Sequence, residues 1–146
     1  MINVEISTII NRPIADVFTF ASNFENNPRW ETNFAEVKRT SGGPIGVGTT
    51  FDCILKVPGQ RVESKFVITE FEPNRKISFE ADKPAQAKPK GSILFESVGG
   101  STKVTSLPRP EMGGFFKLLE PMMAGYIKKQ NTEHLANLKR LLESQV

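Results

Sequence analysis

Hydrophobic residues follow two different periods along this chain, and the change comes close to Phe115. Before that point, apolar and polar residues alternate in short segments separated by turns rich in glycine, proline and asparagine, as in half-buried strands. From Phe115 to Leu142 the apolar residues recur every three or four positions, as in an amphipathic helix. The pattern predicts an antiparallel sheet followed by one long C-terminal helix, or by a short helix and a longer one after Pro121.

About seven of the alternating segments are expected to be strands. They cover residues 2–10, 34–40, 51–57, 62–68, 77–81, 92–97 and 103–107. Pro58 and Gly59 are typical of a type II turn, which predicts a hairpin at that point. Residues 11–23 carry an early proline and helical spacing of their apolar residues, and Pro28 lies shortly before Trp30. Two short helices are therefore expected after the first strand.

Length and composition favour one ordinary domain spanning residues 1–146. The chain has 38% hydrophobic and 24% charged residues, and a chain of this length buries roughly 68–70% of its unfolded surface around a single core. Its one cysteine, Cys53, cannot form an internal disulfide, and the first residues lack the pattern of a signal peptide. We therefore expect a reducing, cytoplasmic location.

Several classes of partner are not expected. The most apolar run, residues 115–127, is interrupted by Lys117, Glu120 and Pro121 and is too short to span a membrane. Nineteen basic and sixteen acidic residues are scattered along the chain, which argues against nucleic acid. The glycine-rich residues 42–48 lack the lysine and hydroxyl of a phosphate loop, and one histidine with one cysteine does not make the usual zinc site. No metal or cofactor is expected.

The order of elements resembles a known superfamily. The residues that carry the resemblance are "RPIADVFTFASNFENNPRW", "VGTTF", "FEPNRKISF", "GSILFESVGGSTKV" and "NLKRLLES". They are similar to the START and birch-allergen-like (SRPBCC) proteins, and among these to the polyketide cyclase/dehydrase-like branch. The resemblance covers nearly the whole chain. It implies an α+β helix-grip fold, in which a seven-stranded curved antiparallel sheet wraps around the long C-terminal helix and leaves a cavity between them.

The resemblance also gives Trp30 a place, because in that family its segment lies at one end of the sheet, near the cavity. Trp30 is expected either to close that end of the core as a buried plug or to form a wall of the pocket. Each apolar candidate for contact with a ligand has plain core packing as its alternative. The candidate ligand-binding residues are Trp30, Phe51, Cys53, Leu55, Phe66, Phe79, Phe95, Met123, Ile127, Asn131 and His134.

Asn131 and His134 are polar residues on the apolar stripe of the C-terminal helix, at about 100° of rotation per residue. An unpaired polar group there costs roughly 1–3 kcal/mol, so water, a strand residue or a ligand should satisfy each one. His134 is accordingly either structural, or a polar anchor for a ligand, or a general acid or base. The opposite arc, with Lys139 and Glu143, is expected to face solvent.

Other polar groups complete the list of candidates. Cys53 and His134 are both expected to face the interior, so a nucleophilic dyad is conceivable, although a lone buried cysteine is commonly a small hydrophobe. Glu70 and Glu96 would point inward if a bulge shifted the strand register. His134 is the only proton carrier that the sequence offers, and it is the candidate for a catalytic residue.

These observations lead to one main functional hypothesis and two alternatives. We expect the chain to bind a hydrophobic or amphipathic small molecule between the sheet and the C-terminal helix, as a monomer or homodimer. The first alternative is an enzyme of polyketide cyclase or dehydratase type, so whether the chain is an enzyme stays open. The second alternative is a protein-interaction module, which would need an exposed apolar patch, and the sequence shows no clear one.

Overall fold

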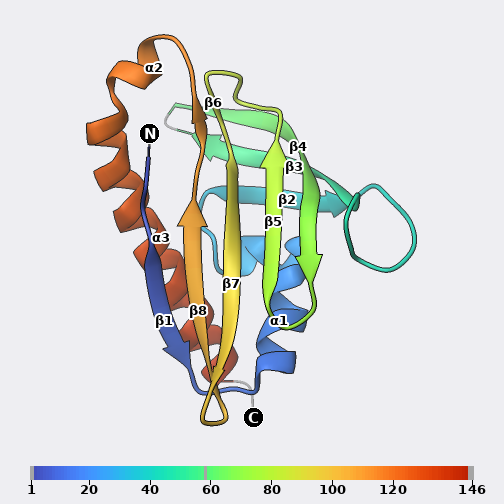
Figure 1. Cartoon of the computed structure of the whole chain (residues 1–146). Coiled ribbons are helices and arrows are strands. Elements are labelled where there is room, and N and C mark those ends of the chain that lie inside the picture. Colours follow the sequence, from blue (N-terminus) through green and yellow to red (C-terminus); the bar gives the residue numbers. More distant parts are fainter. Residues whose placement is uncertain (1, 58, 145–146) are drawn as a thin grey trace.

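The computed structural model describes residues 2–57 and 59–144 and confirms the helix-grip architecture. Seven antiparallel strands form one curved sheet in the order β1-β8-β7-β5-β4-β3-β2, and the long helix α3 runs beside β1 (Figure 1). The seven strands are β1 (Ile6–Ile10), β2 (Phe34–Arg39), β3 (Thr50–Val57), β4 (Gln60–Glu72), β5 (Lys76–Ala81), β7 (Lys90–Val98) and β8 (Ser101–Pro108). Each follows an alternating segment of the sequence.

The predicted turn at Pro58 lies outside the described residues, but the hairpin around it is present. β3 and β4 pair from Thr50 with Val67 to Val57 with Gln60, and Gly59 has a φ of 82°, which suits glycine. The sequence analysis missed a second small sheet. β6 (Ala87–Lys88) pairs with β9 (Glu111–Met112) through two residues on each side, too few for an alternating pattern to show.

Two short helices follow β1, as predicted. α1 (Ile14–Ser22) begins after Pro13 and buries Val17, Phe18 and Ala21, while η1 (Phe24–Arg29) is a 3₁₀ helix that contains Pro28. Asn23 joins the two, because its side chain accepts a hydrogen bond from the Glu25 N–H at 3.1 Å. Together they cover the concave side of the sheet at the end where α3 terminates (Figure 1).

The C-terminal segment forms a short helix and then a long one. α2 (Phe115–Leu118) is followed by its C-cap residue Leu119, and α3 (Glu120–Glu143) begins with Pro121 in its first turn. The break therefore precedes Pro121 instead of following it, because proline is well suited to the first turn of a helix. None of the helices in the described part of the chain is long and apolar enough to cross a bilayer.

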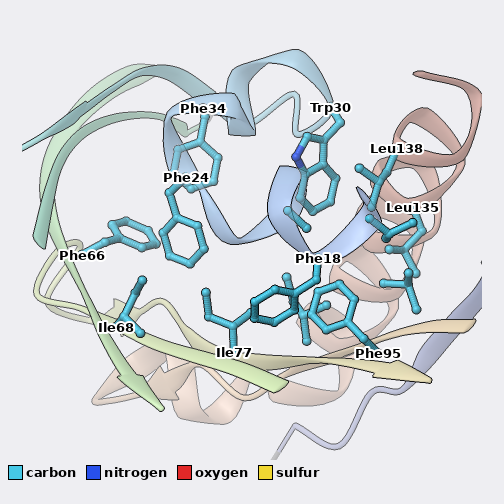
Figure 2. Close-up of a cluster of buried hydrophobic side chains, with 14 of the residues drawn as sticks. Phe18, Phe24, Trp30, Phe34, Phe66, Ile68, Ile77, Phe95, Leu135 and Leu138 are labelled. Carbon is cyan, nitrogen blue, oxygen red and sulfur yellow. The ribbon is translucent and has the colours of Figure 1, made fainter. Parts of the chain in front are cut away.

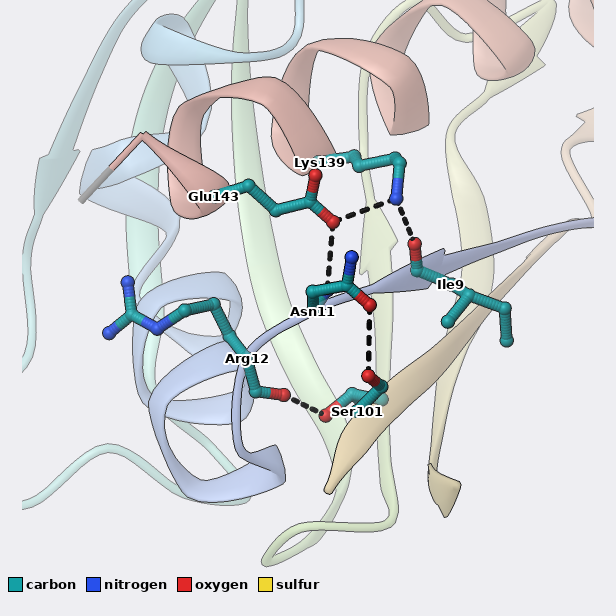
Figure 3. Close-up of polar contacts among 7 residues, drawn as sticks. Ile9, Asn11, Arg12, Ser101, Lys139 and Glu143 are labelled. Atoms are coloured by element: carbon teal, nitrogen blue, oxygen red, sulfur yellow. Dashed lines mark hydrogen bonds and ion pairs between the residues drawn. The ribbon is translucent and has the colours of Figure 1, made fainter. Parts of the chain in front are cut away.

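Lys139 and Glu143 do not simply face solvent as expected, because they fasten α3 to the end of β1 (Figure 3). The Lys139 ammonium donates to the Ile9 carbonyl at 2.5 Å and to Glu143 at 2.7 Å. Glu143 also accepts a hydrogen bond from the Asn11 N–H at 2.8 Å. These bonds occupy part of the backbone of an edge strand, which would otherwise be open to pairing with another chain.

The core fills the space between the concave side of the sheet, α1, η1 and the second half of α3. Its aromatic rings pack on one another, with 5.0 Å between the ring centroids of Phe18 and Phe95 (Figure 2). The ring centroids of Phe24 and Phe51 are 5.1 Å apart. Leu135 and Leu138 close it from the side of α3. This end of the molecule is tightly filled.

Candidate functional site

The predicted ligand-binding residues fall into two groups that lie at different depths. Most are buried in the core: Trp30, Phe51, Cys53, Leu55, Phe66, Phe95 and His134. The others are only partly buried: Phe79, Met123, Ile127 and Asn131. Phe79 lies at the boundary, where it stacks on Phe66 with 5.7 Å between ring centroids and meets Phe24 edge to face at 5.8 Å.

Burial along α3 changes at His134. The inward stripe of the helix is buried at His134, Leu135, Leu138 and Leu142. One and two turns earlier, at Asn131, Ile127 and Met123, the same stripe is only partly covered by protein. The first half of α3 therefore presents an incompletely covered apolar face toward the sheet.

Apolar residues are also exposed on α2 and the outer side of α3. Leu118 is 79% and Met122 74% exposed, and Phe115 and Tyr126 are more than half exposed. The sequence analysis found no clear exposed apolar patch, and the structure shows one here. Leu118, Met122 and Tyr126 lie off the apolar stripe that the helical periodicity predicted, and they are carried by α2 and the half of α3 that has no buried residue among those described.

Trp30 is a buried plug, as one of the two expectations for it required. The side chain is 3% exposed and lies in the core cluster with Leu135 and Leu138 of α3 (Figure 2). Its carbonyl oxygen accepts a hydrogen bond from the Asn137 side chain at 3.2 Å. The polar residues around it in the sequence form a 3₁₀ turn, and their backbone is held against α3.

His134 joins α3 to the same turn. Its Nε2 atom accepts a hydrogen bond from the Thr32 N–H at 3.1 Å and lies 3.2 Å from the Thr32 hydroxyl. An atom that accepts an N–H bond carries no proton, so the ring proton resides on Nδ1. Asn131 is held separately, because it accepts a hydrogen bond from Ser106 of β8 at 3.0 Å and donates to the Ile127 carbonyl.

The charge states of Cys53 and His134 argue against a nucleophilic dyad. Burial raises the pKa of the Cys53 thiol to about 12, with smaller contributions from Asp52 and Glu31. Burial lowers the pKa of His134 to about 4. Both side chains are uncharged at neutral pH, whereas an activated cysteine requires a thiolate.

Glu31 is the interior acid that the sequence analysis missed. Burial raises the pKa of its carboxyl group to about 8. The carboxyl has no hydrogen-bond or ionic partner in residues 2–57 and 59–144, and the residue keeps part of its surface accessible. The only signal in the sequence was its position directly after the buried Trp30.

The two carboxylates considered for an inward role point outward. A bulge between Ile68 and Glu70 does shift the register of β4 against β5. Glu70 nevertheless stays exposed, where it accepts a hydrogen bond from Ser78 at 2.9 Å and pairs with Lys76. Glu96 is exposed on β7.

Further unpartnered polar atoms lie close to Glu31 in the sequence. Asn27 Oδ1, Trp30 Nε1 and Asn33 Oδ1 are buried and have no hydrogen-bond partner among the residues that the structure describes. Each such atom is costly inside a protein, by roughly 1–3 kcal/mol. Their concentration in seven consecutive residues distinguishes the turn between η1 and β2 from the rest of the core.

Two surface grooves lie elsewhere on the molecule. One, of about 560 Å³, runs along the outer side of β1 and the last turns of α3, and another of about 340 Å³ lies beside β4, β5 and β6. Neither is lined by any of the predicted ligand-binding residues, so neither corresponds to the cavity expected between sheet and helix. Among residues 2–57 and 59–144, no three metal-ligating side chains come together to hold an ion.

The fold is that of a helix-grip protein of the SRPBCC type, with a curved sheet, the α1–η1 pair and a long helix. We call the part around the buried residues 134–142 of α3 the filled end, and the part around residues 115–131, which are not buried, the open end. The chain belongs to the family described as polyketide cyclase/dehydrase and lipid transport, whose model matches residues 1–143. No curated protein sequence matches the chain.

Solved structures share the fold at low sequence identity. The protein TTHA0849 from Thermus thermophilus is 16% identical, with a TM-score of 0.77 over 99% of both chains. The di-domain ARO/CYC protein BexL from the BE-7585A biosynthetic pathway is 18% identical, with a TM-score of 0.79 over 98% of this chain and 47% of BexL. Ara h 8.0201 is 15% identical, with a TM-score of 0.70 over 96% of this chain and 97% of that one. At these identities the comparisons establish the fold alone.

Proposed function

We propose that this protein binds a hydrophobic or amphipathic small molecule between the sheet and the first half of α3. The observation that carries the proposal is the change in burial at His134. A helix whose inward apolar stripe is covered at one end and incompletely covered at the other has an apolar surface available to a ligand. The family, described by cyclase, dehydrase and lipid-transport activities, supports the same function.

Adjacent methionines of α3 provide a matched test. Met123 lies on the inward stripe and is partly buried, whereas Met122 points outward and is 74% exposed. We expect Met123→Trp to fill the space in front of the sheet and weaken binding of an apolar fluorophore such as N-phenyl-1-naphthylamine at least tenfold. Met122→Trp should bind the probe like the wild type.

Both variants should be checked for cooperative unfolding, so that a lost site is distinguished from a lost fold. Equal binding by the two variants would contradict the proposed location. Failure of the wild-type protein to bind any apolar probe would contradict the proposed function itself.

A cyclase or dehydratase is the second candidate function, and Glu31 is the observation that favours it. General acids work best when their pKa lies near the working pH, and the pKa of this carboxyl is about 8. His134 is less suited, because its Nε2 already accepts the Thr32 bond. The test is aldol cyclisation of a linear poly-β-ketone thioester and loss of water from the resulting β-hydroxy ketone, followed by mass spectrometry, with Glu31→Gln expected to lower turnover about 10²–10⁴-fold.

A further inference from the structure

We propose that Glu31 recognises the ligand, and that its carboxyl group donates a hydrogen bond to a carbonyl or hydroxyl oxygen of an uncharged, otherwise apolar molecule. The inference rests on the proposed function, because it requires a ligand to reach the interior between sheet and helix. It adds a recognition residue and a ligand class to that function. Position, surroundings and protonation each support it.

The backbone around Glu31 is held in place from two sides. The Glu31 N–H donates to the Asn27 carbonyl at 2.7 Å, which ties the residue to η1. On either side of it, the Trp30 carbonyl accepts from Asn137 and the Thr32 N–H donates to His134, both of α3. The backbone that carries Glu31 is therefore held against η1 and α3.

The Glu31 carboxyl belongs to the turn between η1 and β2, next to the buried core residue Trp30. Its charge makes a minor contribution to the raised pKa of Cys53, which is buried on β3. Neither a hydrogen bond nor an ion pair holds the carboxyl in the part of the chain that the structure describes. An acid that is unpaired and still partly accessible is available to a ligand.

Two polar atoms of the same turn also lack partners within the described part of the chain. Trp30 Nε1 is a donor and Asn27 Oδ1 an acceptor, and both residues are at most 5% exposed. Figure 2 shows the indole nitrogen of Trp30 on the side of the ring that faces Phe34 and Phe24, away from Leu138. Unpaired donors and acceptors in one turn fit a site whose polar partner comes from outside the chain.

The charge state of Glu31 selects the class of ligand. At neutral pH the carboxyl is mainly protonated, because burial raises its pKa to about 8 and no cationic side chain contributes. A protonated acid donates one hydrogen bond and suits a carbonyl or hydroxyl oxygen. An anionic ligand would find no positive partner at Glu31, and an amine would require the ionised form, which burial disfavours.

Three naphthalenes of nearly equal size separate these cases. They are 2-acetylnaphthalene, which carries an oxygen acceptor, 2-ethylnaphthalene, which carries none, and 2-(2-naphthyl)ethylamine, which is a cation at pH 7. Affinities would be measured by fluorescence titration at pH 7 and at pH 9.5. The proteins are the wild type, Glu31→Gln, Glu31→Leu and the control Glu36→Gln, in which the exposed Glu36 of β2 is changed.

We expect the wild type to prefer the ketone over the ethyl compound by about threefold to tenfold at pH 7, the value of one neutral hydrogen bond. The preference should vanish at pH 9.5, where Glu31 is ionised and no longer donates. Glu31→Leu should bind both compounds equally, and Glu31→Gln should retain a preference that no longer depends on pH, because an amide donates at both values. Glu36→Gln should match the wild type.

Other results would overturn the inference. Equal affinity for ketone and ethyl compounds in the wild type would remove Glu31 as a recognition residue and leave the binding site standing. Tightest binding of the amine, lost in Glu31→Gln, would show that Glu31 acts as an ionised counter-charge. If no naphthalene binds to any of the four proteins, the proposed function fails and this inference fails with it.

Discussion

Glu31 and His134 are both uncharged at neutral pH, and their burial makes stability depend on pH in opposite directions. The pKa of Glu31 is raised from 4.5 to about 8, so the folded protein holds a proton that the unfolded chain releases across this range. The free energy of unfolding therefore falls as the pH rises from 4.5 to 8. The pKa of His134 is lowered from 6.5 to about 4, so the unfolded chain takes up a proton in this range that the folded protein does not. The free energy of unfolding therefore falls as the pH falls from 6.5 to 4.

The first prediction follows from the overlap of these two ranges. Between pH 4.5 and 6.5 the two slopes, each about 1.4 kcal/mol per pH unit, offset one another in the wild type. Glu31→Gln should therefore reveal a loss of stability toward acid, and His134→Gln a loss toward alkali. Urea melts at half-unit steps from pH 4.5 to 8 measure the free energy of unfolding of each variant. If this free energy depends on pH in both variants as it does in the wild type, neither group is buried as described.

Trp30 supports the second prediction, which concerns stability alone. Truncating a buried tryptophan removes a large apolar surface, so Trp30→Ala should cost roughly 3–5 kcal/mol. The control is Leu118→Ala, which removes a side chain that is 79% exposed and should change stability by less than about 0.5 kcal/mol. Chemical denaturation measures the free energy of unfolding of both variants. Similar losses of stability at the two positions would contradict the division into a filled and an open end.

At the scale of elements, the C-terminal turn of α3 depends on its attachment to β1. Glu143 accepts from Lys139 and from the Asn11 N–H, and these bonds lower the pKa of its carboxyl group. Beside them, Ser101 donates to the Asn11 side chain and Thr102 to the Arg12 carbonyl, which fixes the corner between β1 and α1 (Figure 3). The long helix is therefore fastened at the end where its core residues lie.

The third prediction concerns this attachment. Glu143→Ala removes the acceptor of both bonds, so the Asn11 N–H and the last turn of α3 should exchange hydrogen faster than in the wild type. Glu133→Ala is the control, since Glu133 is exposed on the same helix. Hydrogen-exchange mass spectrometry on overlapping peptides resolves the two regions. Unchanged exchange at Asn11 would show that Glu143 does not hold this corner.

At the scale of the whole molecule, the two ends differ in packing. α2 and the first turns of α3 lie at one end, and the C-terminal turn of α3 lies at the other, beside α1 (Figure 1). None of the described residues in the first half of α3 is buried, whereas the second half contributes Leu135, Leu138 and Leu142 to the core. Low burial corresponds to low local stability, so the open end should fluctuate more readily.

The fourth prediction tests this asymmetry and its relation to the ligand. Backbone amides of residues 115–131 should exchange faster than those of residues 135–143 in the free protein. Saturation with 2-acetylnaphthalene should slow exchange in the first range and leave the second nearly unchanged, because only the open end gains contacts. Equal protection of both ranges, or slowing confined to residues 135–143, would place the ligand elsewhere.

Local periodicity in the sequence was enough to predict the strands and the long helix, and through them most of the architecture. Alternation at Phe51, Cys53 and Leu55 predicted the buried face of β3, because successive residues of a strand point to opposite sides. The resemblance to the SRPBCC proteins then supplied the curvature of the sheet and the place of Trp30. Strand alternation depends only on neighbouring residues, and the curvature and the place of Trp30 came from the family resemblance. Neither required knowledge of contacts between distant residues.

Which residues of a correctly predicted element are covered depends instead on tertiary contacts. Met123 and Leu138 occupy the same stripe of α3, yet one is partly exposed and the other fully buried. Coverage depends on how far α1, η1 and the sheet extend along the helix. The position of the Glu31 turn likewise depends on the bonds that hold it against α3. Such contacts join residues about a hundred positions apart, and neither period nor composition encodes them.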